Sequence, residues 1–157
     1  MIQIRACTPK DATAVGALLG ELGYEVSAKQ AAEHIRQLTL TGSDPIFLAV
    51  ADGQALGLSA LHICRMLQYS EPILRVTALV VDGRARRRGV GKRLMEHAEH
   101  LAAAAGCGAV ELTSALGRAE AHAFYRSIGY EASSLRFRKT LHGPGSGQSL
   151  NYPRAKG

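Results

Sequence analysis

Hydrophobic residues along this chain follow two spacings, which separate strands from helices. Alternation with a period of two is typical of a half-buried strand, whereas apolar residues at i, i+3, i+4 and i+7 indicate an amphipathic helix. Helices are predicted between Asp11 and Gly23, between Ser27 and Asp44, over 90–105 and over about 119–127. Strands are predicted at 2–4, 46–50, 56–67, 74–81, 109–113, 130–131 and 134–141.

The strongest helix signal follows Val90, where apolar residues recur on one face until Gly106 ends the pattern. This helix joins two predicted strands, 74–81 and 109–113, and supplies the crossover that a parallel pair requires. The earlier strands have no such crossovers and are expected to be antiparallel. The predicted fold is therefore of the mixed α/β class: a mostly antiparallel central sheet with one right-handed parallel βαβ unit, flanked by helices on both faces.

The chain length and the C-terminal composition set the domain organisation. A chain of 157 residues is long enough for one domain with its own core. Residues 1–142 are therefore expected to form a single domain. The segment 143–157, GPGSGQSLNYPRAKG, is rich in Gly, Ser and Pro and is expected to be a flexible tail.

Composition narrows the class of protein. The chain is 46% hydrophobic and 20% charged, which is typical of a globular protein. It contains no apolar run of the roughly 18 residues that a membrane span needs, and its N-terminus does not resemble a secretory signal. Cys7, Cys64 and Cys107 are odd in number and lack metal-type spacing. We therefore expect a reducing, cytoplasmic location and no membrane partner.

The formal net charge of +6 is concentrated in one segment. The basic residues of this segment are Arg84, Arg86, Arg87, Arg88, Lys92 and Arg93. They supply as much positive charge as the whole imbalance, which indicates a local anionic partner. A nucleic-acid partner is not expected, because aromatic residues are few and none interleaves this segment.

The basic segment lies between the predicted strand 74–81 and the predicted helix 90–105. A helix start presents backbone N–H groups without partners and the positive end of the helix dipole. Gly89 and Gly91 allow close approach of the backbone to a ligand. Together with the arginines, these features predict a phosphate-binding turn.

Three phosphate-binding patterns can be compared with this turn. A mononucleotide P-loop would need a glycine where Arg86 stands and a Ser or Thr where Arg93 stands. A dinucleotide-binding loop would need a third glycine in place of Leu94. The pattern that remains is Arg86-x-x-Gly89-x-Gly91.

This pattern and a second motif resemble the GNAT superfamily of acetyltransferases. The segment LVVDGRARRRGVGKRLMEHAE resembles the central strand, loop and helix of that family, and AEAHAFYRSIGYE resembles its later helix. The order of elements is similar from residue 2 to about 141. The resemblance implies a GNAT-type fold and direct transfer of an acetyl group from acetyl-CoA to an amine of a small molecule or an exposed peptide or protein amino group.

The resemblance also implies roles for particular residues. Backbone N–H groups between about Arg87 and Lys92 would anchor the diphosphate, and the pantetheine arm would pair with the strand at Leu79 and Val81. The cofactor-binding residues implied are Leu79, Val80, Val81, Arg86, Arg87, Arg88, Gly89, Val90, Gly91, Lys92 and Arg118. Tyr125 matches the tyrosine that protonates the leaving thiolate, so it is the predicted catalytic residue.

Two positions depart from the family pattern. Arg118 stands where many relatives have asparagine, and Thr77 occupies the strand region where some relatives have a glutamate base. The base is left open among Glu21, Glu25, Glu111, a water molecule or an amine that arrives deprotonated. The missing strand carboxylate motivates the alternative function, a catalytically weak sensor that binds acetyl-CoA.

No metal is expected as a cofactor. His97 and His100 lie in EHAEH, which lacks the spacing of a zinc-binding helix, and both are expected to be solvated on the polar helix face. The expected partners are acetyl-CoA and an amine acceptor. Because the family often forms dimers, a homodimer is a further expectation.

Overall fold

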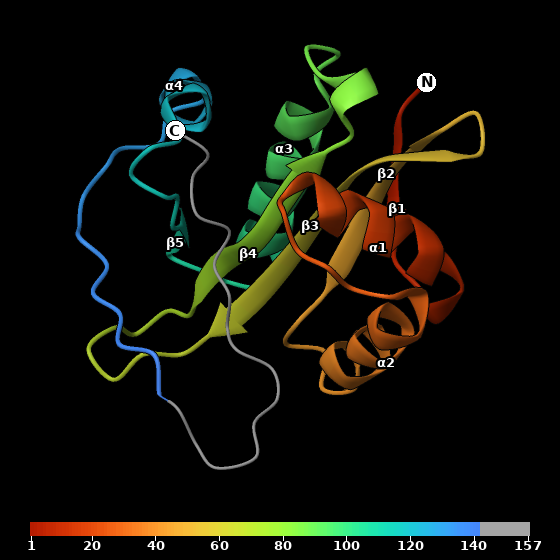
Figure 1. Ribbon diagram of the computed structural model, residues 1–157. Helices are drawn as coiled ribbons and strands as arrows, with labels where there is room; N and C mark the ends of the chain where they lie inside the picture. The colour runs from red at the N-terminus through yellow and green to blue at the C-terminus, as the bar shows by residue number, and fades with distance from the viewer. Residues whose placement is uncertain (142–157) are drawn as a thin grey trace. The chain divides into compact units, whose positions relative to one another are not determined.

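The computed structural model describes residues 1–141 (Figure 1), so the predicted tail 143–157 lies outside the described residues. Contacts between residues divide the chain into two compact units, Met1–Leu112 and the residues from Thr113 onward. Each unit is described by itself.

The first unit is built on a five-stranded sheet in the order β1-β2-β3-β4-β5. The strands are β1 (Gln3–Ala6), β2 (Ile46–Ala51), β3 (Gln54–Cys64), β4 (Ile73–Val81) and β5 (Ala109–Leu112). The pairs from β1 to β4 are antiparallel, and β4 and β5 are parallel. The predicted mixed sheet is therefore confirmed, although β3 ends at Cys64 rather than near residue 67.

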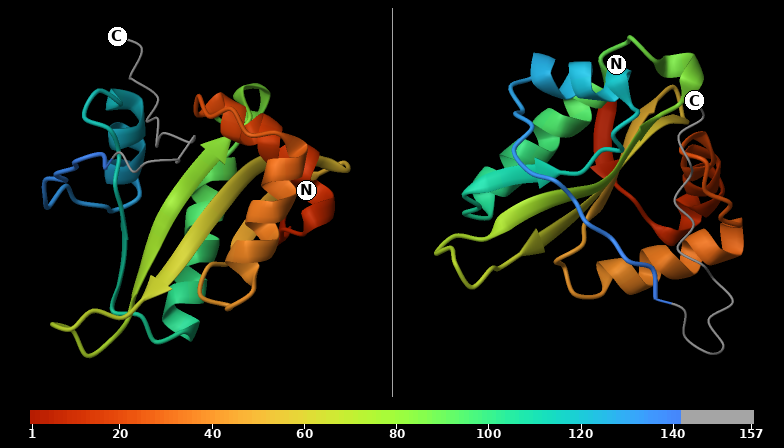
Figure 2. Two further views of the ribbon diagram at one scale, coloured as in Figure 1. Left: turned by 60° about the horizontal axis from the view of Figure 1, so that its bottom comes forward. Right: turned by 60° about the vertical axis from the view of Figure 1, so that its left-hand side comes forward.

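Helices cover both faces of this sheet, as the right-hand view of Figure 2 shows. The helices of this unit are α1 (Ala12–Glu21), α2 (Ala28–Thr39) and α3 (Val90–Ala104), with short 3-10 turns η1 (Pro9–Asp11) and η2 (Gly83–Ala85). One core lies between the sheet and α1 and α2, and includes Leu48, Leu58 and Val80. The other lies under α3 and includes Ala49, Leu56 and Leu94.

The helix starts have local causes in the sequence. Ser27 caps α2, because its hydroxyl accepts the Gln30 backbone N–H and the Gln30 side chain accepts the Ser27 backbone N–H. At the turn before α1, the Asp11 carboxylate accepts the backbone N–H of Thr8 at 2.8 Å, as the Gln30 side chain does for Ser27. Asp11 is also bound by both terminal nitrogens of Arg5, at 2.7 and 2.9 Å. These bonds join β1 to the turn that precedes α1.

The described part of the second unit contains α4 (Ala119–Ser127) and residues without regular structure. The helix agrees with the sequence prediction, but the strands predicted at 130–131 and 134–141 are absent. Leu135 and Phe137 alternate with polar residues as a strand would, yet 72% and 90% of their surface is exposed. Alternation does not supply the partner strand and buried face that stabilise such a segment, so these predictions were wrong.

Within residues 1–141, no helix combines the length and the apolar composition required to cross a membrane. The three cysteines are all free thiols.

Candidate functional site

The central strand β4 has one edge that is only half covered. Its pairing with β5 runs from Ile73 opposite Ala109 to Val76 opposite Leu112 and stops there. Strand β4 continues to Val81, so within residues 1–141 its last five residues have no strand on that side. At about 3.3 Å per residue, the four steps from Thr77 to Val81 leave an open edge of roughly 13 Å.

The polar backbone groups along this open edge belong to alternate residues. The N–H of Asp82 donates to the carbonyl of Leu56 on β3 at 2.8 Å, so Asp82 faces β3. In an antiparallel pair the residues alternate between facing the partner strand and facing away. Leu79 and Val81 therefore present their N–H and C=O groups to the open edge. Val80, opposite Leu58, directs its N–H and C=O toward β3 and buries its side chain in the core under α1.

The basic turn follows the last residue of β4 and is anchored by a buried residue on each side. Ala85 and Val90 are each 1% exposed and both belong to the core under α3. Residues 86–89 between them are exposed. Asp82 fixes the entry to the turn, because its carboxylate accepts the backbone N–H of Arg84 at 2.8 Å. The guanidinium and the backbone N–H of Arg84 together lower the pKa of Asp82 to about 2.

The backbone of the turn takes two left-handed conformations. Arg87 has φ 61° and Gly89 has φ 77°. Gly89 is also the N-cap of α3 and offers no side chain to its first turn. The first helical bond runs from Arg93 N–H to Gly89 C=O at 3.0 Å, so the N–H groups of Val90, Gly91 and Lys92 have no acceptor within the helix. These donors lie at the position where the sequence predicts an anion site.

The basic side chains around the turn differ in whether they have an ion-pair partner. Arg86 lies 3.7 Å from Glu21 on α1, and Lys92 lies 3.8 Å from Glu96 one turn along α3. Within residues 1–141, Arg87 and Arg88 form no hydrogen bond or ion pair. Their charges are therefore not neutralised by a fixed carboxylate, which favours attraction of an anionic ligand.

A bulge interrupts β4 at the start of the open edge. Ala60 pairs with Ala78 but Leu61 pairs with Val76, which leaves Thr77 unpaired in the ladder. The Thr77 hydroxyl donates to the carbonyl of Ala60 at 3.1 Å, and the residue is exposed. A bulge turns backbone groups out of the regular ladder and is frequent beside active sites. In agreement with the sequence, Thr77 provides no carboxylate here.

The predicted acid, Tyr125, lies on α4 in the second unit. Its ring packs against Phe124, with centroids 5.2 Å apart, and against Tyr130, with centroids 6.1 Å apart. Burial raises the pKa of Tyr125, and the charge of Arg118 at the N-cap of α4 acts in the opposite direction. The phenol therefore keeps its proton at neutral pH, as a general acid must. Arg118 and Tyr125 thus lie in one unit, and the turn at 86–92 lies in the other.

His97 does not lie in solvent as predicted. Its ring packs edge-on against Phe47 of β2 with centroids 4.3 Å apart, and its Nδ1 is buried without a hydrogen bond. Burial lowers the pKa of His97, and His100 on the next turn of α3 adds to this effect. The sequence prediction was wrong because α3 turns this face toward the sheet. Among the described residues, no group of His, Cys, Asp and Glu could hold a metal ion.

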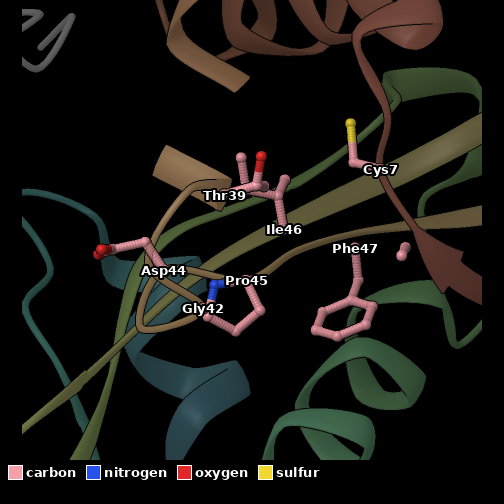
Figure 3. A pocket seen from close by; sticks show the side chains of 8 residues that line it. Cys7, Thr39, Gly42, Asp44, Pro45, Ile46 and Phe47 are labelled. Carbon is pink, nitrogen blue, oxygen red and sulfur yellow. The ribbon is translucent and has the colours of Figure 1, made fainter. Parts of the chain in front are cut away.

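Two hollows mark the surface of the first unit. The smaller, of about 250 Å³, is shown in Figure 3, where the Phe47 ring points toward α3 and the Asp44 carboxylate points away from Cys7. The larger, of about 550 Å³, lies between α1, the first residues of β3 and residues 82–84. It borders the basic turn on the side of Glu21, so space is open beside the expected diphosphate site.

Sequence reasoning missed the residues that hold the site in place. Gly57 on β3 lies beneath Val90 at the start of α3, and Ala85 anchors the turn. It also missed the contact between His62 and Asp44, whose side chains meet at 2.7 Å. No local spacing marks this contact, because the two residues are 18 positions apart and a strand pairing brings them together.

Comparisons with known proteins show the family to which this chain belongs. The family model described as "Acetyltransferase (GNAT) family" matches residues 14–130. The aminoalkylphosphonate N-acetyltransferase of Salmonella typhimurium is 31% identical over 140 residues, covering 88% of this chain and 91% of that protein. An uncharacterized N-acetyltransferase of Bacillus subtilis, YhdJ, is 28% identical over 143 residues, covering 90% of this chain and 100% of that protein.

A solved structure shows the same fold. A GNAT family acetyltransferase of Staphylococcus aureus superposes with a TM-score of 0.78 at 22% identity, covering 89% of this chain and 98% of that one. Members of this family generally use acetyl-CoA as the acetyl donor. The family match over most of the chain, together with the relatives named as N-acetyltransferases, shows that this chain belongs to the GNAT family and is an acetyltransferase.

Proposed function

We propose that this chain binds acetyl-CoA along the open edge of β4 and transfers the acetyl group to a primary amine of a small molecule. The observation that carries the proposal is that two sets of available backbone groups follow each other along the chain. The edge at Leu79 and Val81 leads directly into the unpaired N–H groups at the start of α3. An extended pantetheine arm and a diphosphate are joined in the same order in coenzyme A.

Each part of the cofactor would meet a different kind of group. The diphosphate would accept hydrogen bonds from the N–H groups of residues 90–92, with added attraction from Arg87 and Arg88. The arm would add to the sheet as a strand does, through the N–H and C=O groups of Leu79 and Val81. The thioester at the end of the arm would then lie near the bulge at Thr77, where a backbone N–H would stabilise the oxyanion.

The leaving thiolate would take its proton from Tyr125. The raised pKa of this phenol keeps the acid form populated at neutral pH. This role requires α4 to place Tyr125 at the sulfur of the bound cofactor. Tyr125 is therefore the proposed catalytic acid, and Arg118 at the start of the same helix is a proposed phosphate contact.

A small-molecule acceptor is favoured by the relative that acts on aminoalkylphosphonates, which are compact primary amines with an anionic group. We infer a cytoplasmic location from the free cysteines, because acetyl-CoA transfer and reduced thiols both suit a reducing compartment. An exposed peptide or protein amino group is the competing acceptor class.

Two measurements test the function. Acetyl-CoA should raise the melting temperature, whereas NAD, ATP and duplex DNA should not. Release of the free CoA thiol should then be followed with 2-aminoethylphosphonate, a polyamine, an amino acid and a short peptide with a free N-terminus. Thiol release with the first three but not the peptide supports the proposal. Binding of acetyl-CoA without turnover on any amine would instead favour the sensor function.

A further inference from the structure

An acid–base pair lies on the sheet face that carries α1 and α2. Nδ1 of His62 on β3 lies 2.7 Å from Oδ1 of Asp44, which precedes β2. His62 is two residues from Ala60, which packs in the core of that face, so both side chains point the same way. The His62 side chain keeps 39% of its surface exposed and that of Asp44 keeps 26%. Within residues 1–141, Nε2 of His62 has no hydrogen-bond partner.

The pair lies at the far end of the open edge from the basic turn. His62 pairs with Arg75 on β4, two residues before the bulge at Thr77. Val81, where the turn begins, is six residues from Arg75, or roughly 20 Å along the strand. If the cofactor arm follows the edge as proposed, the reactive thioester reaches the bulge and the amine must approach there. The inference therefore rests on the proposed function.

The carboxylates considered from the sequence are less suitable as bases. Glu111 on β5 accepts a hydrogen bond of 2.6 Å from Arg75. Glu21 lies 3.7 Å from Arg86, beside Gly83 at the opposite end of β4. Each of these carboxylates already faces a guanidinium, so it is not free to accept a proton from an amine. Glu25 is exposed in the connection between α1 and α2.

We propose that His62 is the general base of the acetyl transfer and that Asp44 is its positioning residue. A neutral His62 that donates its Nδ1 proton to Asp44 holds Nε2 as a lone-pair acceptor. The carboxylate also stabilises the imidazolium that forms when Nε2 takes a proton. Imidazole and carboxylate play these two roles together in many active sites.

During the transfer, the acceptor nitrogen loses two protons and the CoA sulfur leaves with the electron pair of the C–S bond. The acceptor ammonium gives one N–H proton to Nε2, and the freed lone pair forms the C–N bond at the thioester carbon. The C–S bond breaks, and its electron pair leaves with the CoA sulfur, which takes up a proton. The new amide nitrogen gives its second proton to water, which in turn restores the acid that protonated the sulfur, and His62 releases its proton to solvent. The whole transfer converts an ammonium and acetyl-CoA into an amide, CoA thiol and one released proton.

The charged and titratable groups around His62 are few. Asp44 contacts it from the segment before β2, and Arg75 lies opposite it on β4 with Glu111 attached from β5. Cys64, two residues along β3, shares the same face. Among these groups, Asp44 is the one whose side chain contacts the His62 ring directly.

The test compares four variants of the full chain: His62→Gln, His62→Gly, Asp44→Asn and His100→Gln. The last is the control, since His100 is an exposed histidine on α3 and not part of the site. The dependence of kcat/KM on pH is measured with the amine of the panel above that the wild-type protein acetylates fastest. Acetyl-CoA affinity is measured in parallel to detect damage to folding or to cofactor binding.

We expect His62→Gln to lower kcat/KM by about 10²-fold and to abolish the acidic limb that the base imposes, with acetyl-CoA affinity unchanged. Asp44→Asn should lower kcat/KM less, because the base remains but its ring is no longer held by a charged carboxylate. Free imidazole should restore part of the activity of His62→Gly, which a purely structural role would not allow. If His62→Gln keeps wild-type kcat/KM and pH profile while the wild-type protein turns over, His62 is not the base. If the wild-type protein acetylates no amine, the proposed function fails and this inference fails with it.

Discussion

Gly57 of β3 lies directly beneath Val90, the first residue of α3. A Cβ placed on Gly57 would be 2.9 Å from Cγ1 of Val90, 3.0 Å from Cδ1 of Leu94 and 3.0 Å from the carbonyl oxygen of Val80. The first turn of α3 therefore sits as close to the sheet as a backbone without a side chain permits. This contact fixes the distance from the sheet of the N–H groups that would bind the diphosphate.

Gly57→Ala should destabilise the first unit by about 1–3 kcal/mol, because the added methyl group overpacks the helix–sheet contact. It should also weaken acetyl-CoA binding, since the start of α3 must move. Chemical denaturation and cofactor titration measure the two effects. Gly20→Ala is the matched control: Gly20 lies in α1 with no atom within 4 Å of the added Cβ, so the change should be neutral or stabilising by up to about 1 kcal/mol. Equal stability of the two variants would contradict the close packing of α3.

The surroundings of Gly89 differ from those of Gly57, because a Cβ on Gly89 would meet no protein atom within 4 Å. Gly89→Ala should cost about 1–2 kcal/mol of stability through its left-handed backbone, and Gly89→Val more. Both should also lower acetyl-CoA affinity. Gly106→Ala is the control, since Gly106 has φ 74° at the other end of α3 and is equally open. It should lose similar stability but bind the cofactor normally. Cofactor binding that falls equally in both glycine variants would show that the turn has no contact with the diphosphate.

Tyr125→Phe should lower kcat by about 10²-fold or more, because the thiolate then leaves without its acid. Acetyl-CoA affinity should change little, since the phenyl ring keeps its packing against Phe124 and Tyr130. Steady-state kinetics and cofactor titration check both statements. Tyr69→Phe is the control, because Tyr69 is 56% exposed in the connection before β4. An unchanged kcat in Tyr125→Phe, with chemistry shown to be rate-limiting, would remove this residue from the mechanism.

Asp11 should contribute stability that depends on pH. The hydrogen bonds from Arg5, followed by those from Thr8, lower the pKa of Asp11 to about 2. A folded-state pKa below the unfolded value of about 3.9 means that this stability is present above pH 3.9 and is lost as the pH falls toward 2. At pH 7, Asp11→Asn should therefore cost about 1 kcal/mol as a lost cap and ion pair.

Urea denaturation at pH 7 and near pH 2.5 measures this difference. Asp52→Asn is the control, because Asp52 lies in the exposed turn between β2 and β3 with φ 50°, a conformation that asparagine also accepts. It should change stability little at either pH. A penalty for Asp11→Asn that stays constant down to pH 2.5 would contradict the assigned pKa.

The sequence alone determined the features that depend on neighbouring residues. The period of the apolar residues located α3 and α4, and Ser27 marked the start of α2, because caps and helix faces involve positions three or four apart. The crossover between β4 and β5 followed from chain length, which made the mixed sheet predictable. The Arg86-x-x-Gly89-x-Gly91 turn was readable for the same reason, since its amides come from consecutive residues.

The tertiary structure decided the features that depend on distant residues. The open edge of β4 exists because the pairing with β5 ends at Leu112. No local sequence pattern indicates where a partner strand ends. His97 turned out to contact Phe47, and His62 to contact Asp44, because sheet registers set by the whole core bring them together. The segment 130–141 has a strand-like alternation but no strand, since pairing requires an available edge. The local sequence therefore defined the turn proposed to bind the cofactor, and long-range packing defined the surface on which an acceptor amine would lose its proton.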